Sequence, residues 1–383
     1  MKIAVVTPGR SHLLNMAKEH IRNGHDVTFY TMVPKKRCES FGLPRKNVVS
    51  FFLFCAPLML IFRKLHLPGE WNREIYYRVV RIVDYLASVR LKPCDIFIGI
   101  SGCTIKSAKK AKDKYGALFI CDRGCKHILS QDEILKSTPN AQCVFPKDIP
   151  VELKQYKLAD YMALPSQHAK ESFIEHGIDE KKLFVNPYGV NLSLFKPTIL
   201  IENDVTRVIY DVIMVGIWNM RKGVDLLTEA CKKANLKLLH VGPLSPDCEF
   251  PKLNSFHHIE PVNEHELPKY YANAKVFCLP SREDGFGLVL FQAMACGLPL
   301  VYAHNTGGPD LKRLVDDKKF LFEMPEYNTD SLSETLLKAI AVADTQPKVT
   351  ARNYLDSDAY ANISWEAYGK RYNDFLQQQV PNK

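Results

Sequence analysis

The sequence predicts an α/β protein made of two Rossmann-like domains in tandem, each with a parallel sheet covered by helices. Three observations support this fold class. The 383 residues are too many for one ordinary hydrophobic core and fit two domains of about 150–200 residues each. Apolar runs of strand length alternate with helical patterns, which is typical of βαβ units. This alternating series stops before residue 198 and begins again near residue 211, so the sequence contains two such units.

The first domain is predicted over residues 1–198. Five short apolar runs are expected to form its strands: residues 2–7, 26–31, 95–100, 117–121 and 160–164. One helix is expected from about His12 to Asn23, and another, rich in Lys and Ala, after residue 100. The series ends at a predicted turn over residues 187–190 (PYGV).

The second domain is predicted over residues 199–357, followed by a terminal helix over residues 358–383. Four apolar runs are expected to form its strands: residues 211–216, 237–242, 275–280 and 298–302. A helix is expected after the first of these strands, from about Gly223. In the terminal segment, Trp365, Tyr368, Tyr372 and Phe375 recur with helical spacing and form one aromatic face. We expect this helix to cross back and bury that face on the first domain.

The N-terminus and the cysteines indicate a cytoplasmic protein. The apolar run after Lys2 is interrupted by Thr7, Pro8 and Gly9, so it lacks the pattern of a cleavable secretory signal. The 11 cysteines are scattered without a CxxC pair. This distribution argues against a disulfide framework and against a structural zinc site, so no metal is expected.

The net charge of +9 favours a negatively charged partner, either a phosphorylated ligand or an anionic membrane surface. No dense run of Lys and Arg interleaved with aromatic residues occurs, so a nucleic acid is not expected as a partner. Residues 51–62 (FFLFCAPLMLIF) are wholly apolar but too few to span a bilayer. They predict either a strand over residues 48–54 followed by a buried turn, or a segment flanked by Arg63 and Lys64 that attaches peripherally to the inner membrane face.

The first candidate for ligand chemistry is the strand–helix corner at residues 216–223 (GIWNMRKG). In an open parallel sheet, ligands bind at the carboxyl ends of the strands. Arg221 and Lys222 are expected at this corner, facing a cleft, where paired cations beside backbone amides neutralise a diphosphate without a metal. Two adjacent basic residues are more often solvated surface, so this interpretation depends on their position after a strand.

The second candidate is the segment 281–299 (SREDGFGLVLFQAMACGLP). A strand ends at Pro280, acidic and glycine residues make the turn, and a helix begins near Gly287. Free amides at a helix start donate to phosphate or sugar oxygens, and Asp284 is expected to accept hydrogen bonds from sugar hydroxyls. Gln292, two helical turns later, is expected to reach a ribose or sugar hydroxyl. The alternative is an acidic first turn that stabilises the helix dipole, with Gln292 as a surface residue.

Three ordered segments resemble the retaining glycosyltransferases of family four, which have the GT-B fold: residues 186–197 (NPYGVNLSLFKP), 215–230 (VGIWNMRKGVDLLTEA) and 283–301 (EDGFGLVLFQAMACGLPLV). The resemblance is strong from about Tyr188 to Gly308 and weaker in the first domain. It implies transfer of a sugar from a nucleotide-diphosphate sugar, UDP- or GDP-linked, to a saccharide, lipid-linked or other hydroxyl acceptor, without a cofactor. Surface polysaccharide or glycoconjugate biosynthesis is the expected setting.

The resemblance also implies roles for individual residues. Arg221 and Lys222 match the pair that contacts the donor diphosphate, and Gly9 matches a glycine turn near it. The remaining residues expected to hold the donor are Gly216, Glu283, Asp284, Gly285, Phe286, Gly287, Leu288, Gln292, Gly307 and Gly308. The last two glycines make a turn after the strand at residues 298–302, and their amides are expected to donate to the nucleotide sugar.

The sequence departs from this family at its paired glutamates. The first position is Asp284, which keeps the carboxylate with one methylene fewer, and the second is Gln292, an uncharged amide. Glu283 is an adjacent substitute, although the spacing favours Asp284. The identity of the donor base and sugar therefore stays open.

A second departure concerns the histidine that the family places at the end of a middle strand, near the anomeric centre. Here either Arg123 takes that position, or His127 reaches back into the cleft; His127 as an ordinary capping or core residue is the alternative. Ser101 and Gly102, which follow the strand at residues 95–100, are candidates for the acceptor side, as is His12 near the start of the first helix.

The implied mechanism is front-face transfer, in which Arg221 and Lys222 stabilise the leaving diphosphate and its oxygen deprotonates the acceptor hydroxyl. No protein nucleophile is required, in agreement with the lack of a glycosidase-like carboxylate pair. The sequence also permits two alternative functions. One is a catalytically weakened nucleotide-sugar or glycan-binding protein, which the changes at Asp284 and Gln292 permit. The other is a GT-B sugar-nucleotide epimerase, for which the sequence offers few catalytic carboxylates and histidines.

Overall fold

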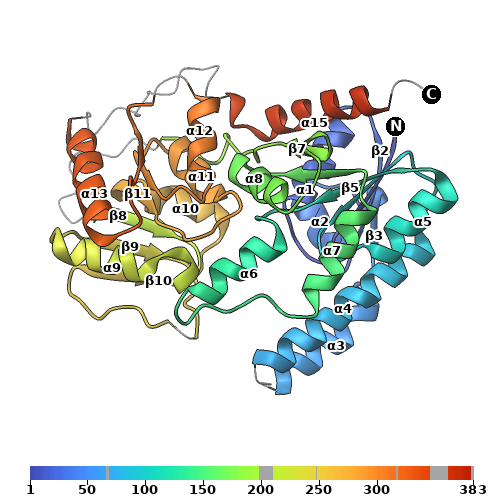
Figure 1. Cartoon of the computed structure of the whole chain (residues 1–383), viewed down its shortest axis with the longest axis horizontal. Coiled ribbons are helices and arrows are strands. Elements are labelled where there is room, and N and C mark those ends of the chain that lie inside the picture. Colours follow the sequence, from blue (N-terminus) through green and yellow to red (C-terminus); the bar gives the residue numbers. More distant parts are fainter. Residues whose placement is uncertain (66–68, 198–209, 247, 316–317, 346–360, 381–383) are drawn as a thin grey trace.

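The computed structural model describes the chain except for residues 66–68, 198–209, 247, 316–317, 346–360 and 381–383. The described residues form two parallel sheets, of seven and six strands, with helices packed around them (Figure 1). This confirms the predicted α/β class with two Rossmann-like units. The predicted boundaries after residues 198 and 357, and the expected start of the terminal helix at residue 358, lie outside the described residues.

The first sheet has the strand order β3-β2-β1-β4-β5-β6-β7, with all neighbours parallel. Its strands are β1 (Lys2–Val6), β2 (Asp26–Thr31), β3 (Val48–Ser50), β4 (Ile96–Ile100), β5 (Leu118–Asp122), β6 (Tyr161–Leu164) and β7 (Leu183–Val185). Val5 in the central strand pairs with Phe29 on one side and Ile98 on the other. All three are fully buried, which explains why these strands are continuous apolar runs rather than alternating ones.

The helices of the first unit follow the strands in chain order. They are α1 (Leu13–Arg22), α2 (Lys35–Ser40), α3 (Phe52–Leu65), α4 (Gly69–Arg90), α5 (Ile105–Tyr115), α6 (Ile128–Ser137), α7 (Asp148–Leu158) and α8 (Gln167–Glu175). The expected helix between His12 and Asn23 is confirmed, with these two residues as its caps. The predicted strands agree with β1, β2, β4, β5 and β6 to within one or two residues.

The prediction of a strand over residues 48–54 is wrong in its second half. Strand β3 ends at Ser50, and α3 begins at Phe52. Ser50 Oγ accepts a hydrogen bond from the Phe52 amide at 3.3 Å, and the Cys55 amide donates to the Phe51 carbonyl at 3.2 Å, so a helical turn starts there. A wholly apolar run has no alternation that would distinguish a strand from a helix.

Helices α3 and α4 pack on each other and form a hairpin at the lower edge of the first unit (Figure 1). Several large apolar side chains of this hairpin face solvent: Phe52, Leu53, Phe54 and Trp71. Leu53 is 81% exposed and Trp71 is 61% exposed. Among the described residues, no helix combines the length and apolar character that crossing a bilayer requires.

The second sheet has the strand order β10-β9-β8-β11-β12-β13, again with all neighbours parallel. Its strands are β8 (Tyr210–Val215), β9 (Leu238–Val241), β10 (Phe256–Ile259), β11 (Ala274–Leu279), β12 (Leu300–Tyr302) and β13 (Leu321–Glu323). The helices around it are α9 (Val224–Lys233), α10 (Leu267–Tyr271), α11 (Leu288–Ala295), α12 (Gly308–Leu314) and α13 (Thr329–Asp344).

The terminal helix α15 (Trp365–Gln379) crosses back from the second unit and lies along the first, as predicted (Figure 1). Its aromatic face is buried: Tyr368 and Tyr372 are each at most 1% exposed. The helix packs on α1, where Asn23 Nδ2 donates to the Gly369 carbonyl at 3.3 Å. Just before α15, the Val190 amide donates to the Ile363 carbonyl at 2.8 Å, so the two chain crossings between the units lie side by side.

Candidate active site

The loops that follow β1, β4, β5, β8, β11 and β12 carry most of the predicted site residues. These loops lie at the carboxyl edges of the two sheets, where parallel α/β folds bind ligands. The loops of the two units contact each other. Ser166 Oγ of the first unit donates to the Gly285 carbonyl at 2.6 Å, and the Gln167 amide donates to Asp310 Oδ1 at 3.0 Å.

The basic corner after β8 is a short 3-10 helix, Met220–Lys222, that contains Arg221 and Lys222. Asn219 caps it, with Oδ1 accepting from the Lys222 amide at 3.1 Å. Gly223 follows with φ 71°, and a Cβ there would overlap the Pro280 carbonyl oxygen. A side chain at this position would therefore displace the corner from the end of β11.

The basic corner is paired with the acidic loop after β11. Arg221 Nη1 donates to Glu283 Oε2 at 3.0 Å, and the Lys222 ammonium contacts the Asp284 carboxylate. Burial alone would raise the pKa of Asp284, but Lys222 and Arg221 outweigh it and hold that pKa below its ordinary value. Asp284 is therefore ionised at neutral pH and available as a hydrogen-bond acceptor.

Asp284 also fixes the start of α11. Its Oδ1 accepts from the Gly287 amide at 3.1 Å, and Gly287 has φ 71°, a conformation that favours glycine. Between them, Gly285 lies against the first unit so closely that a Cβ would overlap the Gly124 carbonyl oxygen. Phe286 is buried and stacks on Phe291 with ring centroids 4.2 Å apart. The loop is thus rigid and seated against the other domain.

Arg123 follows directly after β5 and faces the cleft. It occupies the strand-end position for which the sequence offered Arg123 and His127 as the two candidates. Its Nη1 donates to Glu152 Oε1 and its Nη2 to Gln131 Oε1, both at 2.8 Å. Burial alone would lower the pKa of Arg123, but Glu152, together with weaker contributions from Tyr156, Cys125 and Glu283, outweighs burial and raises the pKa. Gln131 Nε2 in turn donates to Glu283 Oε2 at 3.2 Å, so this cluster reaches the acidic loop of the second unit.

His127 is a capping residue in the interior of the first unit. Its Nδ1 accepts from the Leu129 amide at 3.3 Å at the start of α6, and its ring stacks on His176 with centroids 4.2 Å apart. Burial, then His176 and Arg123, lower its pKa to about 3, so it is neutral. The structure therefore places His127 in the alternative role and leaves the strand-end position to Arg123.

The expectation that the Gly307 and Gly308 amides face a ligand is not met. The Gly307 amide donates to the Phe286 carbonyl at 2.7 Å, and the Gly308 amide donates to Thr306 Oγ1 at 3.1 Å. A Cβ on Gly307 would overlap the Phe286 carbonyl oxygen. These glycines are needed because the turn packs tightly on the acidic loop, and both amides are already bonded within the protein.

The remaining glycines have different surroundings. Gly216, with φ 130°, packs against Gly242, and its carbonyl oxygen lies 2.8 Å from His240 Nε2. Gly9 is in the turn after β1, where a Cβ would meet no atom within 4 Å. The next residue, Arg10, contacts Glu264 of the second unit at 3.1 Å, so this turn also spans the two units.

Gln292 and His12 both face protein groups. The Tyr271 hydroxyl donates to Gln292 Oε1 at 3.2 Å, and Gln292 is buried, which excludes the surface alternative for this residue. His12 Nε2 lies 2.7 Å from Asp122 Oδ1, and its ring stacks on Tyr188 with centroids 4.2 Å apart. His12 therefore supports the floor of the site at the end of β5, between Asp122 and the interdomain turn.

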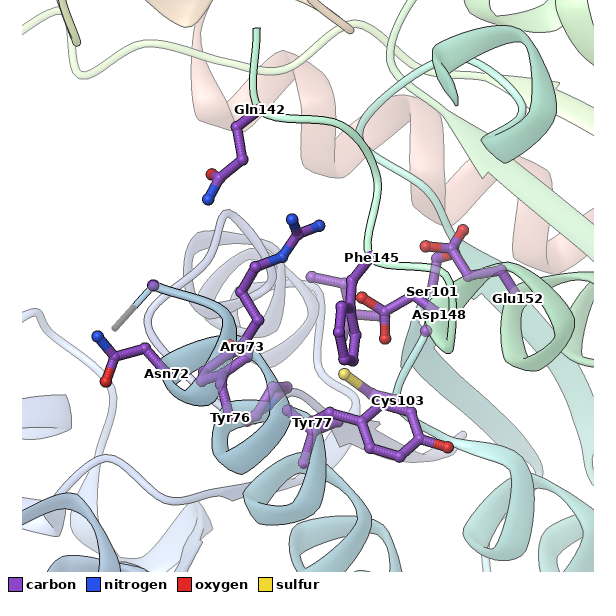
Figure 2. A pocket seen from close by; sticks show the side chains of 15 residues that line it. Asn72, Arg73, Tyr76, Tyr77, Ser101, Cys103, Gln142, Phe145, Asp148 and Glu152 are labelled. Atoms are coloured by element: carbon purple, nitrogen blue, oxygen red, sulfur yellow. The ribbon is translucent and has the colours of Figure 1, made fainter. Parts of the chain in front are cut away.

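Two cavities open at this site. The α4 cavity, of about 580 Å³, lies between α4, the β4–α5 turn and α7; its walls include Arg73, Tyr76, Tyr77, Ser101, Gly102, Asp148 and Glu152 (Figure 2). The interdomain cavity, of about 420 Å³, lies between Arg123 and Gln131 on one side and Asn219 and Arg221 on the other. The cavities share part of their lining: Gln142, Phe145, Asp148 and Glu152. A ligand group in one is therefore adjacent to a ligand group in the other.

The α4 cavity combines aromatic rings with carboxylates, as Figure 2 shows for Tyr77, Phe145 and Asp148. The Tyr77 and Phe145 rings meet edge to face at 6.0 Å, and the Arg73 guanidinium lies 5.1 Å from the Phe145 ring centre. Burial, followed by the charge of Glu152, raises the pKa of Asp148. Such a lining offers apolar ring faces and hydrogen-bond acceptors to the same ligand.

Ser101 and Gly102, which the sequence suggests for the acceptor side, line this cavity, and sequence analysis missed the residues opposite. Gln131, Asp148 and Glu152 lie in segments with no glycine turn or strand end to single them out. Glu152 is buried, and it accepts from Ser101 Oγ at 2.5 Å and from the Tyr156 hydroxyl. In the sequence, Glu152 is one acidic residue of an ordinary helix, and only the packing of α7 on β5 brings it to Arg123. The described residues contain no group of three or more His, Cys, Asp or Glu arranged to hold a metal ion.

The chain is similar to several known glycosyltransferases. The family model described as "Glycosyl transferases group 1" matches residues 210–341. A Haemophilus influenzae protein named only as an uncharacterized glycosyltransferase is 29% identical over 93% of this chain and 91% of its own length. The O-antigen chain mannosyltransferase B of Escherichia coli is 30% identical over 27% of this chain and 26% of its own. Other curated relatives are matched over 37% to 57% of their own length.

Among solved structures, HepE of Anabaena in complex with UDP and glucose superposes with a TM-score of 0.62. The match has 16% sequence identity and covers 99% of this chain and 100% of HepE. At this identity the likeness concerns the fold, and it extends over both units and the crossing helix. It shows that the chain has the two-domain GT-B fold, and within that fold the second unit is similar to the group 1 glycosyltransferases.

Proposed function

We propose that this protein transfers a hexosyl unit from a nucleotide-diphosphate sugar to a hydroxyl group of a saccharide or lipid-linked acceptor, with retention of anomeric configuration. The observation that carries this proposal is the paired arrangement of Arg221 with Glu283 and Lys222 with Asp284 beside the interdomain cavity. The two cations supply positive charge for a diphosphate, and the Asp284 carboxylate supplies an acceptor for a sugar hydroxyl, while the buried Glu283 holds Arg221.

On the donor side, Arg221 and Lys222 stabilise the charge that develops on the leaving diphosphate, a role that needs no metal ion. Asp284 is ionised and accepts from a donor-sugar hydroxyl. The complex of HepE with UDP and glucose supports a UDP-sugar as the first donor to test, with GDP-sugars as the second. Gln292 takes the position where the family has a second glutamate, and its bond to Tyr271 orients the amide.

On the acceptor side, the α4 cavity binds a sugar ring. Apolar sugar faces stack on aromatic side chains such as Tyr77 and Phe145, while Asp148 and Glu152 accept from hydroxyls. Because this cavity shares four lining residues with the interdomain cavity, we expect the acceptor hydroxyl to approach the donor sugar from the side of the departing phosphate. That phosphate then takes the hydroxyl proton, which is front-face transfer without a protein nucleophile.

We further propose that the protein works at the inner face of an anionic membrane during surface polysaccharide biosynthesis. The net charge of +9 and the exposed apolar residues of the α3–α4 hairpin support this setting. The same helix α4 supplies Arg73, Tyr76 and Tyr77 to the acceptor cavity, so an acceptor anchored in lipid reaches the site from the hairpin. One relative is named as an O-antigen chain mannosyltransferase, which supports a polysaccharide acceptor.

A donor panel tests the chemistry. Purified protein is incubated with UDP- and GDP-sugars, with and without EDTA, and nucleotide release is followed. We expect release from one donor, insensitive to EDTA and lost in Arg221→Ala; Arg45→Ala, an exposed arginine paired with Glu39, is the matched control. Release that requires a divalent metal ion would contradict the metal-free mechanism.

The same panel separates the two alternative functions. Donor binding without nucleotide release would identify a binding protein that has lost catalysis. Conversion of the donor sugar to its epimer with the nucleotide still attached would identify an epimerase.

Vesicle co-sedimentation tests the membrane setting. We expect binding to vesicles rich in anionic phospholipid at low salt, and its loss in the double variant Leu53→Asp, Phe54→Asp. Leu337→Asp, which changes an exposed leucine on α13 of the second unit, is the control and should bind like the wild type. Equal sedimentation of all three proteins would contradict a role for the hairpin.

A further inference from the structure

Gln131 joins the two domains through both ends of its amide. Its Oε1 accepts from Arg123 Nη2 of the first domain at 2.8 Å, and its Nε2 donates to Glu283 Oε2 of the second domain at 3.2 Å. Glu283 accepts and Arg123 donates, so position 131 needs a side chain with both an acceptor and a donor, which the amide of Gln131 supplies in this orientation. Gln131 is on α6, which projects toward the second unit in Figure 1.

These bonds belong to a longer chain of contacts that connects the two cavities. On the first-domain side, Arg123 Nη1 donates to Glu152 Oε1 at 2.8 Å, and Glu152 also accepts from Ser101 in the wall of the α4 cavity. On the second-domain side, the Glu283 oxygen that receives Gln131 also receives Arg221 Nη1 at 3.0 Å. Acceptor cavity and donor-side cation are thus linked through five side chains.

Glu283 makes this chain sensitive to the distance between the domains. Its side chain is 0% exposed, and its second oxygen, Oε1, is buried without a hydrogen-bond partner. A buried carboxylate with an unsatisfied oxygen is costly and depends strongly on the donors that it has. One of its two donors, Gln131, belongs to the opposite domain. When the domains separate, Glu283 loses that donor and becomes accessible to water, and the geometry that it imposes on Arg221 is lost.

We propose that Gln131 is a positioning residue that couples closure of the two domains to the orientation of Arg221. With the domains closed, Gln131 fixes Glu283, and Glu283 fixes Arg221 toward the interdomain cavity. With the domains open, Arg221 is not held, so stabilisation of the leaving diphosphate is complete only when the acceptor side is in place. This inference rests on the proposed function, since that function assigns the diphosphate to Arg221.

Steady-state kinetics of Gln131→Met give the first test. Methionine has a similar length but neither donates to Glu283 nor accepts from Arg123. We expect kcat for transfer to fall about tenfold or more, with donor KM changed by less than about threefold, because the second domain still binds the donor in the ground state. Glu133→Met, an exposed position two residues later in α6, is the control. Wild-type kcat in Gln131→Met would overturn the proposal.

The variant Gln131→Glu adds a readout that a purely structural role would not change. A protonated glutamate accepts from Arg123 and donates to Glu283 as the amide does, whereas an ionised one places a negative charge against Glu283. We therefore expect its transfer rate relative to the wild type to rise as the pH falls from about 8 to about 6. A ratio that is independent of pH would overturn the proposal.

A measurement without donor separates this inference from the proposed function. In a double-mutant cycle on the free energy of unfolding, Gln131→Met and Glu283→Gln should be clearly non-additive, because they remove the same contact. Additive effects would overturn the coupling even in an active enzyme. If the wild type releases nucleotide from no donor while the two changes remain coupled, the proposed function fails and the contact between the domains stands.

Discussion

At the scale of single residues, three consecutive charged side chains of the acidic loop have three different partners. Arg282 makes a bidentate pair with Asp225 at the start of α9, at 2.7 and 2.6 Å. Glu283 and Asp284 pair with the two basic residues of the corner before it. Because every charge is held, the basic corner and the acidic loop behave as one rigid unit. A bound diphosphate therefore meets cations whose positions are already fixed, which lowers the reorganisation needed for catalysis.

His20 is a residue whose burial makes stability depend on pH. Its ring is 0% exposed, lies edge to face with Tyr372 at 4.9 Å, and has no hydrogen-bond partner on either nitrogen. Burial, followed by the nearby His25, lowers its pKa from 6.5 to about 3. The neutral form is therefore favoured by folding, so its contribution is complete above pH 6.5 and is lost as the pH falls toward 3.

The predicted consequence is a loss of about 2 kcal/mol of unfolding free energy at about pH 5 that can be assigned to His20 alone. Replacement by phenylalanine keeps an aromatic ring but removes the titration. We expect urea unfolding of His20→Phe to depend less on pH than that of the wild type, by this amount. The exposed His257→Phe serves as control. An unchanged pH dependence in His20→Phe would show that His20 is protonated in the folded protein.

At the scale of elements, the strands were predictable and the α3–α4 hairpin was not. The central strands are buried on both faces, so they stand out as short apolar runs between turns. Helix α4 buries Val79, Val80, Val83 and Ala87 at helical spacing, but β-branched and aromatic side chains with several arginines hide the pattern. In α3 the uniform apolar run has no period, and the helix follows from packing on α4.

Prediction of the candidate site from sequence is limited in the same way. The sequence singles out Arg221, Lys222 and Asp284 because they lie in loops that follow strands and that resemble motifs of the glycosyltransferase family. Gln131 and Glu152 lie on helices α6 and α7, and they gain significance only when Arg123 reaches both of them. Contacts of this kind depend on tertiary packing, which is not encoded in local spacing. The shift of His127 from the cleft to a cap has the same origin, because Phe173 and His176 of distant sequence enclose its ring.

Helix α15 gives a prediction at the element scale. Leu376 is 0% exposed on the face that packs on the first domain, while its neighbour Gln377 is exposed. We expect Leu376→Ala to reduce the free energy of unfolding by about 2–5 kcal/mol, from lost burial and the cavity left behind. Gln377→Ala should change it by less than about 0.5 kcal/mol. Thermal and urea unfolding of the two variants make the comparison. Similar values for both would mean that α15 does not hold the first domain together.

At the scale of the whole molecule, the two domains meet through the backbone at one point in the cleft. Gly285 of the acidic loop lies against Gly124 and Cys125, and no side chain separates them. Nearby, Tyr188 packs on Phe286 with centroids 5.0 Å apart, and Ser166 bonds the Gly285 carbonyl. This contact brings Arg123 of one domain and Glu283 of the other within reach of Gln131.

A methyl group at this point should keep the domains apart. In Gly285→Ala the new Cβ overlaps the Gly124 carbonyl, and backbone cannot yield as a flexible side chain does. We expect a larger radius of gyration by small-angle X-ray scattering and a reduced transfer rate, with donor hydrolysis forming a larger share of turnover. For the scattering measurement, Gly69→Ala is the control, because its added methyl meets no atom within 4 Å. An unchanged radius of gyration would show that the contact is not required for closure.

The crossing helix has a consequence for how the protein is made. Asn23 at the end of α1 and Gly369 in α15 are bonded although 346 residues separate them in the chain. At ordinary translation rates, roughly 20 to 70 seconds pass between the synthesis of these two residues. Throughout that interval the surface of the first domain that receives Tyr368 and Tyr372 is open to solvent. The newly made first domain therefore exposes an apolar surface until the second domain has been synthesised behind it.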